Sequence, residues 1–287
     1  MGLCYRNLAL GAGDGAVRYL LCSLANLLVW VTVSGAEAGD QPLPAASPSS
    51  GSWIVTIGAD IRSTPRYVGS DDFVVVPIPY FDMRRAGSSE AFHSPHDSPS
   101  IALYDNGVFA AGPVASLIFP RRHAFNPALD VSATYQLGAY FDYWAMPWLR
   151  GRVEALQGFG GSTGLTANFS VDAVLPLSAA LTWSGGPRAR AVTAATEGPY
   201  FSVTPVQSSA SGLSVFNAGG GWQSVGAGTQ LKYRFNRVWA FYGFVEYDKL
   251  IGATASSPIV TEAGGSSNQW TTGIGVIYSF GLNGLPF

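Results

Sequence analysis

The feature that most constrains the fold is an alternation of side-chain types near the C-terminus. Within Gln269–Phe280, every second position from Ile274 to Phe280 is apolar or aromatic, and Thr272 begins the same series. The positions between them are small or polar, apart from Ile277. In a strand these two sets fall on opposite faces. A strand between lipid and a barrel lumen has one apolar face that ends in aromatic residues at the membrane interface. A half-buried strand of a soluble sandwich has the same period, so the rest of the chain has to decide between the two folds.

The same alternation recurs in strand-length segments along most of the chain. Val131–Tyr143 and Leu165–Leu175 show it most clearly. Gly185–Gly212 has no sustained period and is predicted to be a long excursion. Further strands are predicted at 53–62, 73–83, 149–157, 179–183, 213–218, 222–235 and 238–250, and two more within 101–119, joined by a tight turn at Asp105-Asn106-Gly107.

Charged residues are rare for a soluble surface. They make up 12% of the 287 residues, against about 25% in soluble domains. The formal net charge is -2 and no run of lysine and arginine is present, so the basic patch that nucleic-acid binding needs is missing. A soluble lipocalin or sandwich would carry more lysine, glutamate and aspartate, and we expect lipid to cover much of this surface instead.

The N-terminal segment indicates export. Two arginines precede the apolar run Leu20–Val33, and Ser34–Ala38 has the small-x-small pattern of a cleavage site. We therefore predict a cleaved signal peptide at residues 1–38, rather than a membrane anchor, and a disordered lead-in at 39–52. Both cysteines of the chain would be removed with the signal peptide.

No later segment is long and apolar enough for a transmembrane helix, because glycine, proline or a charge interrupts every apolar run. An exported chain with an apolar surface and no such helix can cross a bilayer only as a closed barrel, whose backbone groups pair with each other. The prediction is an all-β fold, a single antiparallel transmembrane β-barrel of about 10-12 strands. It occupies residues 53–280 in the outer membrane of a Gram-negative cell and is followed by a short tail at 281–287.

Five charged residues are predicted to face the lumen of this barrel: Asp60, Arg62, Arg150, Arg152 and Glu154. They share strand faces with small and polar residues, opposite the apolar face. Such charges either line a small water-filled pore or pair across the lumen and plug it. Because the interior width of a barrel grows with its strand number, a narrow or closed lumen is favoured at this size.

Candidate catalytic and metal-binding residues are few. The cluster His93–Asp97 contains two of the three histidines, but Pro95 separates them and the spacing is not typical of a metal site, so an exposed loop is predicted. His123 is the remaining histidine, and no serine or carboxylate stands out as its partner in a hydrolase. We expect no enzymatic activity, no metal site and no cofactor.

Short motifs spread over most of the chain carry a family resemblance. They are Pro65–Asp72, Pro77–Tyr80, Pro199–Thr204 with Gln207–Ser209, Ser211–Leu213, Tyr247–Gly252 and Ser257–Val260. Together they resemble the MipA/OmpV family of outer-membrane proteins, scaffolding proteins named for interaction with a murein hydrolase. Ser202 departs from the pattern, since a glycine is more usual there.

The resemblance implies a periplasm-facing barrel in contact with outer-membrane lipid and without catalytic residues. We expect a non-enzymatic scaffold that links a murein-degrading lytic transglycosylase to peptidoglycan synthesis, with the murein hydrolase and a peptidoglycan synthase as partners. The alternative is a porin-like channel for small solutes, involved in osmotic or antibiotic response.

The sides on which the loops lie can also be predicted. If the last strand ends in the periplasm, the tight turn Asn236-Arg237 is periplasmic and the loop Ile251–Ser267 is external, in line with the usual rule for loop lengths. Counting back through the predicted strands, Gly185–Gly212 would be periplasmic, where a murein enzyme could touch it.

Overall fold

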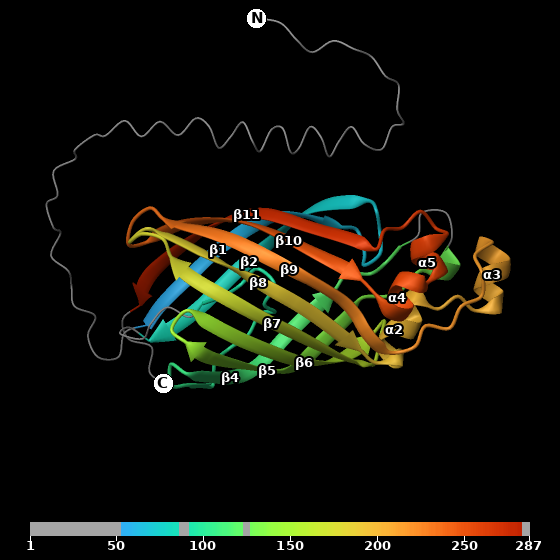
Figure 1. Cartoon of the computed structure of the whole chain (residues 1–287), viewed down its shortest axis with the longest axis horizontal. Coiled ribbons are helices and arrows are strands. Elements are labelled where there is room, and N and C mark those ends of the chain that lie inside the picture. The colour runs from blue at the N-terminus through green and yellow to red at the C-terminus, as the bar shows by residue number, and fades with distance from the viewer. Residues whose placement is uncertain (1–52, 86–91, 123–126, 283–287) are drawn as a thin grey trace, which may run out of the picture. The chain divides into compact units, whose positions relative to one another are not determined.

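The structure, a computed structural model, describes residues 53–85, 92–122 and 127–282. Within them, one antiparallel sheet of eleven strands curls into a barrel, in the order β2-β1-β11-β10-β9-β8-β7-β6-β5-β4-β3 (Figure 1). The fold class and the strand number agree with the prediction. The predicted signal peptide at 1–38 and lead-in at 39–52 lie outside the described residues. The strands are β1 (Trp53–Pro65), β2 (Phe73–Arg85), β3 (Tyr104–Asp105), β4 (Phe109–Ile118), β5 (Thr134–Met146), β6 (Leu149–Gly160), β7 (Leu165–Pro176), β8 (Leu181–Val192), β9 (Gly221–Arg234), β10 (Trp239–Leu250) and β11 (Asn268–Leu282).

Polar side chains are buried inside the barrel, and apolar side chains are exposed on its outside. Asp142, Arg150 and Asp172 are at most 7% exposed, whereas Phe81 and Leu137 are 69% and 59% exposed. A water-soluble domain has the opposite distribution. An apolar surface that extends over most of the strands needs lipid to cover it. The barrel is therefore a transmembrane one, and the soluble sandwich is excluded.

Aromatic side chains gather near both ends of β10 and β11. Trp239 and Tyr278 are cross-strand partners whose ring centroids lie 4.8 Å apart. Tyr247 and Trp270, at the other end of the same two strands, have centroids 4.7 Å apart. Aromatic residues at both ends of a barrel are typical of the two membrane interfaces.

β2 lies at one edge of the sheet and β3 at the other. Across the described part of the chain, no strand pairing joins β2 to β3, so the hydrogen-bond ladder has a seam there. β2 pairs with β1 over its whole length although it contains Pro77 and Pro79. Proline has no N–H to donate. It is therefore tolerated in an edge strand, where the N–H would point to the side that has no partner strand. The two prolines, which a central strand tolerates poorly, are explained by this edge position.

The helices of the described chain lie at one end of the barrel (Figure 1). They belong to the connections that follow β4, β8 and β10, which end on the same side because the strands alternate in direction. None of the helices in residues 53–85, 92–122 and 127–282 is long and apolar enough to span a membrane. The helices are η1 (Pro127–Leu129), α2 (Ala194–Phe201), α3 (Pro205–Ser211), α4 (Gly252–Ser256) and α5 (Pro258–Thr261).

The prediction that Leu213–Ala218 forms a strand is wrong. β8 continues to Val192, and α2 and α3 follow before β9 begins. One strand fewer changes the parity of the loops, so the connections 193–220 and 251–267 lie at the same end rather than at opposite ends. The sequence prediction makes Gly185–Gly212 periplasmic. The connection 193–220 lies instead on the same side as 251–267, which is the side predicted to be external.

Both predicted tight turns are confirmed. Gly107 lies between β3 and β4 with φ 82°, a left-handed conformation that glycine adopts without strain. Between β9 and β10, the side-chain oxygen of Asn236 accepts hydrogen bonds from the N–H groups of Val238 and Trp239, both at 2.9 Å. These side-chain contacts fix the hairpins locally.

β11 is longer than predicted. It ends at Leu282 and not at Phe280, because Gly281 and Leu282 still pair with Ile54 and Trp53 of β1. The remainder of the predicted tail, residues 283–287, lies outside the described residues.

The small residues of β11 make room for aromatic rings from β10. Tyr242 is the cross-strand partner of Gly275, and Phe244 is the partner of Gly273. A Cβ at Gly275 would lie 2.4 Å from the Tyr242 ring, and a Cβ at Gly273 would lie 2.5 Å from the Phe244 ring. The two rings cluster with Ile277. The small face of β11 thus lets large side chains fill this part of the interior.

Candidate functional site in the barrel interior

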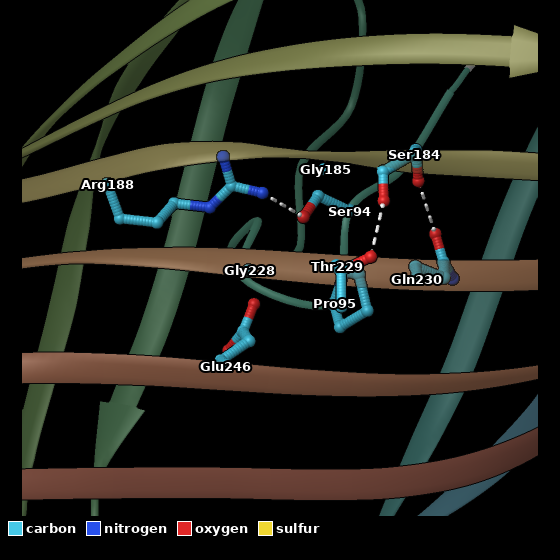
Figure 2. A pocket seen from close by; sticks show the side chains of 9 residues that line it. All are labelled: Ser94, Pro95, Ser184, Gly185, Arg188, Gly228, Thr229, Gln230 and Glu246. Atoms are coloured by element: carbon cyan, nitrogen blue, oxygen red, sulfur yellow. Dashed lines mark hydrogen bonds between the residues drawn. The ribbon is translucent and has the colours of Figure 1, made fainter.

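A segment of chain between β2 and β3 contacts the inward side chains of the barrel wall. We call Phe92–Ser100 the inner segment. It reaches β6 through Asp97 and Ser98 and β8 through Ser94. Figure 2 shows Ser94 and Pro95 beside strands β8 and β9, with Glu246 of β10 on the far side. The inner segment therefore lies within the barrel and not over its rim.

Arg150 of β6 is a fully enclosed charge, with no exposed surface. Its two terminal nitrogens donate to the two oxygens of Asp97, at 2.7 and 3.0 Å. One of them also lies 2.6 Å from Asp172 of β7. The guanidinium carbon is 4.6 Å from the centroid of the Phe92 ring. A bidentate arginine–carboxylate pair of this kind is strong and sets geometry as well as charge.

Arg152 lies two residues further along β6 and faces the same way, because alternate residues of a strand share a face. It donates to Glu154 at 2.9 Å and to Asp142 of β5 at 3.2 Å. Its Nε lies 3.7 Å from Asp97, so this carboxylate faces two arginines. Its guanidinium also lies 4.1 Å from the centroid of the Tyr140 ring.

Glu154 holds the next residue of the inner segment. The N–H of Ser98 donates to one carboxylate oxygen at 3.1 Å, and the hydroxyl of Ser98 donates to the other at 2.8 Å. Besides Arg152, Asn168 of β7 is a further donor, at 3.0 Å. Glu154 is 2% exposed, so these donors replace the water that a carboxylate otherwise needs.

Residues 94–97 of the inner segment form a turn, and Arg188 of β8 holds its first residue, Ser94. It donates to the hydroxyl of Ser94 at 3.0 Å (Figure 2) and lies 2.5 Å from Asp172. Asp172 therefore joins Arg150 and Arg188. A buried charge network of this kind is stable only when every charge has a partner.

The predicted pair on β1 lies beside this cluster. Arg62 and Asp60 form a bidentate pair with both distances at 2.7 Å. Tyr242 donates to Asp60 at 3.0 Å, and the guanidinium of Arg62 lies 5.3 Å from the Phe244 ring centroid. Arg62 also reaches the carbonyl of Pro95 at 3.5 Å.

The five residues expected in the lumen are thus placed in two groups. Arg150, Arg152 and Glu154 lie together around the inner segment, while Asp60 and Arg62 pair with each other. Asp142, Asp172 and Arg188 belong to the same network and were not named as candidates. The alternation already placed Asp142 and Asp172 on polar faces, but Arg188 fell in a segment not recognised as a strand.

The prediction that His93–Asp97 forms an exposed loop is wrong. The side chains of Asp97 and His96 are only 3% and 16% exposed. The segment is polar, as a loop would be, and its charges are matched by charges of the wall. Among the described residues, no group of three or more His, Cys, Asp or Glu is placed to hold a metal ion. His123 lies outside the described residues.

Besides the inner segment, which fills the interior, a group of packed loops closes the helical end of the barrel. We call the connections 66–72, 193–220 and 251–267 the helical cap. Val203, Leu213 and Ile259 pack against one another there, and Phe201 packs against Val260. The motifs that carry the family resemblance at 65–72, 199–204, 211–213, 247–252 and 257–260 meet in this cap or at its base.

Two buried polar side chains tie the cap together. Arg121 donates to the carbonyl of Leu129 at 2.9 Å and to that of Tyr200. Thr254 of α4 donates to the carboxylate of Glu197 in α2. Glu197 is 1% exposed, and burial raises the pKa of its carboxyl group, although the hydrogen bond from Thr254 acts in the opposite direction.

Comparisons with known proteins identify a family to which the chain is similar. The family model described as MltA-interacting protein MipA matches residues 57–280. No curated protein matches the chain. Among solved structures, the chain is similar to the KdgM porin, with 13% sequence identity over 79% of this chain and 99% of that chain and a TM-score of 0.36. It is also similar to the NanC porin, with 10% identity over 79% and 98% and a TM-score of 0.38. The outer membrane protein OprG from Pseudomonas aeruginosa has 14% identity over 80% and 96%, with a TM-score of 0.28.

Proposed function

Because the chain belongs to the MipA family and forms an outer-membrane β-barrel, we propose that it is a non-enzymatic scaffold. It holds a murein-degrading lytic transglycosylase close to a peptidoglycan synthase. The partner class follows from the family description, which names an interaction with MltA, and from the resemblance, which implies a murein hydrolase.

The observation that carries this proposal is the filled interior. The inner segment occupies the barrel where a pore would run, and it is held on β6 and β8 by buried charges. A barrel that is plugged by its own chain is better suited to anchoring a partner at the membrane than to passing solutes.

The partner surface is expected at the end with short turns. In outer-membrane barrels the short turns are periplasmic and the longer connections are external. Here the turns 106–108, 147–148, 177–180 and 235–238 lie at one end, and the helical cap lies at the other end together with the turn 161–164. Murein enzymes work on the periplasmic side, so they would meet these turns and not the cap.

Site-specific crosslinking tests the proposal. A photoreactive residue replaces Ala179, which is exposed in a short turn, and in a second variant it replaces Ala210, which is exposed in α3. Crosslinks from position 179 to a lytic transglycosylase and a peptidoglycan synthase are expected in growing cells, and position 210 is the matched control. Crosslinks to neither enzyme from position 179, or equal crosslinks from both positions, would contradict the scaffold role.

The second candidate function is a channel for small solutes. It is favoured by the way in which the inner segment is held. In the described part of the chain, residues 92–98 are held by side chains of the wall and not by a backbone ladder. Such a segment can leave without unzipping a strand. Conductance in planar bilayers separates the two functions, because the plugged scaffold gives no stable pore in simple salt and a channel does.

A further inference from the structure

Asp97 of the inner segment contacts the barrel wall as a bound ligand would. Its carboxylate takes both terminal nitrogens of Arg150 and faces Nε of Arg152. The planar guanidinium of arginine matches a carboxylate in this bidentate way, which makes it the usual residue for carboxylate recognition. Within its own turn, the carboxylate of Asp97 also accepts a hydrogen bond from the N–H of Ser94.

The two arginines keep their positions without Asp97, because carboxylates of the wall hold them. Arg150 lies 2.6 Å from Asp172 of β7. Arg152 lies 2.9 Å from Glu154 and 3.2 Å from Asp142 of β5. These partners are on strands, whose positions are fixed by the ladder. We call the guanidinium groups of Arg150 and Arg152 the arginine fork. The arginine fork is therefore preorganised and does not depend on the inner segment.

The fork also has an unused donor. The Nε–H of Arg150 is buried and has no hydrogen-bond partner among the described residues. Asp97 meets this guanidinium end-on, through the terminal nitrogens only. A buried donor without a partner is costly, and a free ligand that is not restrained by a peptide turn can approach the side of the guanidinium and use it.

The neighbouring group shows what a ligand needs beside its carboxylate. Glu154 accepts an amide N–H and a hydroxyl from Ser98, the residue that follows Asp97. A ligand that replaces the turn should therefore carry an N–H or O–H donor next to its carboxylate. Hydroxy acids and N-acyl amino acids share this chemistry.

We propose that Arg150, Arg152 and Glu154 form a binding site for solutes with a carboxylate beside a hydroxyl or amide donor, that Asp97 and Ser98 occupy it in the closed barrel, and that such solutes displace the inner segment. The inner segment is then a competitor of the solute. The proposal goes beyond the scaffold role and does not require it.

The test measures the exposure of the inner segment directly. Cys4 and Cys22 are replaced by alanine and Ser94, which is 6% exposed, by cysteine. The rate at which uncharged N-ethylmaleimide modifies the thiol introduced at position 94 is followed in vesicles. A group tethered by a short chain has an effective concentration on the order of millimolar, so about 50 mM potassium gluconate should displace it and raise the rate roughly tenfold. Potassium N-acetylserinate is the second test solute and carries an amide N–H beside its carboxylate.

Two controls separate recognition from general effects. Potassium chloride at the same concentration gives the same screening without a carboxylate, and glucose gives the hydroxyls without a charge. Neither should change the rate. Asp97→Asn, made in the same background, should react fast without any solute, and Asp71→Asn, which changes an exposed carboxylate, should behave like the parent chain.

The outcomes decide the proposal. Acceleration by gluconate alone assigns the site to hydroxy acids, by N-acetylserinate alone to acylated amino acids, and by both to the shared chemistry. Rates in gluconate and in N-acetylserinate that both equal those in chloride and glucose would overturn it. Hydrogen exchange of residues 92–98 in the unaltered chain repeats the measurement without the Ser94→Cys substitution, and protection that neither gluconate nor N-acetylserinate changes would overturn it as well. Neither readout measures partner binding, so a negative result leaves the scaffold proposal standing.

Discussion

Replacing Arg150 by glutamine should be the most damaging single change in the barrel interior. Arg150 has no exposed surface and faces Asp97 at 2.7 Å, Asp172 at 2.6 Å and Asp142 at 3.7 Å. Its loss leaves these carboxylates with fewer cations in a place that water does not reach. Breaking a buried pair on one side costs about 3–5 kcal/mol, because a charge is left uncompensated. This corresponds to roughly a thousandfold change in the unfolding equilibrium.

The change can be measured on protein refolded into lipid vesicles. Folded and unfolded barrel are separated by their electrophoretic mobility without heating, and the folded fraction is followed in urea. Arg66→Gln is the matched control, since Arg66 lies 3.9 Å from Asp72 and both side chains are more than half exposed. A pair of this kind contributes at most about 1 kcal/mol.

The result that would refute the reasoning is a loss of stability at Arg150→Gln no larger than that at Arg66→Gln. If Arg150→Gln does not fold at all, Arg150→Lys gives a second reading. Lysine keeps the charge but cannot form the bidentate pair. Arg150→Lys should therefore still fold, with a larger loss of stability than Arg66→Gln.

Three further predictions concern other parts of the molecule. Gly275→Ala should lower the free energy of unfolding by about 1–3 kcal/mol, because its Cβ would lie 2.4 Å from the Tyr242 ring; an unchanged urea midpoint would contradict this. Cysteine at Ala210 should react with an impermeant maleimide on intact cells, and cysteine at Ala179 only after the outer membrane is opened; the reverse pattern would invert the orientation of the barrel. Burial raises the folded pKa of Glu197 above its unfolded value, so stability should fall as the pH rises from the unfolded to the folded pKa, and Glu197→Gln should remove this slope in urea titrations.

Gly275→Ala and Glu197→Gln each have a control of the same kind. Gly219→Ala places a Cβ in open space and should be silent. Glu262, which is exposed in the same cap, can be changed to glutamine beside Glu197, and an equal loss of the slope at both positions would show that burial is not its cause.

The faces of the strands could be predicted from the sequence because the side-chain period of a strand is two. Once Arg150, Arg152 and Glu154 were placed on one face of β6, their position inside the barrel followed from the apolar face opposite. The seam at β2 could not be predicted, although a central strand tolerates Pro77 and Pro79 poorly. Their meaning depends on which strand lies beside β2, and this is a property of the whole sheet.

The short segment Leu213–Ala218 shows where the period fails. Six residues can alternate by chance, and Leu213 is buried because it packs against Val203 and Ile259 in the helical cap, not because it lies in a sheet. Short alternations cannot be separated from the apolar contacts of a loop. One false strand was sufficient to reverse the predicted side of the 193–220 connection.

The inner segment could not be predicted for a different reason. Polar residues with Pro95 between two histidines are typical of an exposed turn, and nothing within the segment distinguishes a turn that lies in water from one that lies among buried charges. The information is in the partners: Asp97 is buried because Arg150 and Arg152 face it from β6. Such a pairing is set by the register of distant strands.

The positions that carry the family resemblance also have a physical meaning. Gly69, in the motif at 65–72, has φ 94°, and a Cβ there would lie 2.8 Å from Val260 in the motif at 257–260. Its N–H donates to Gln269 at 2.9 Å. These contacts join the connections 66–72 and 251–267 and the start of β11 at one end of the barrel. Most of the motifs therefore lie at the capped end of the barrel, whereas the short turns 147–148, 177–180 and 235–238 at the other end lie outside them.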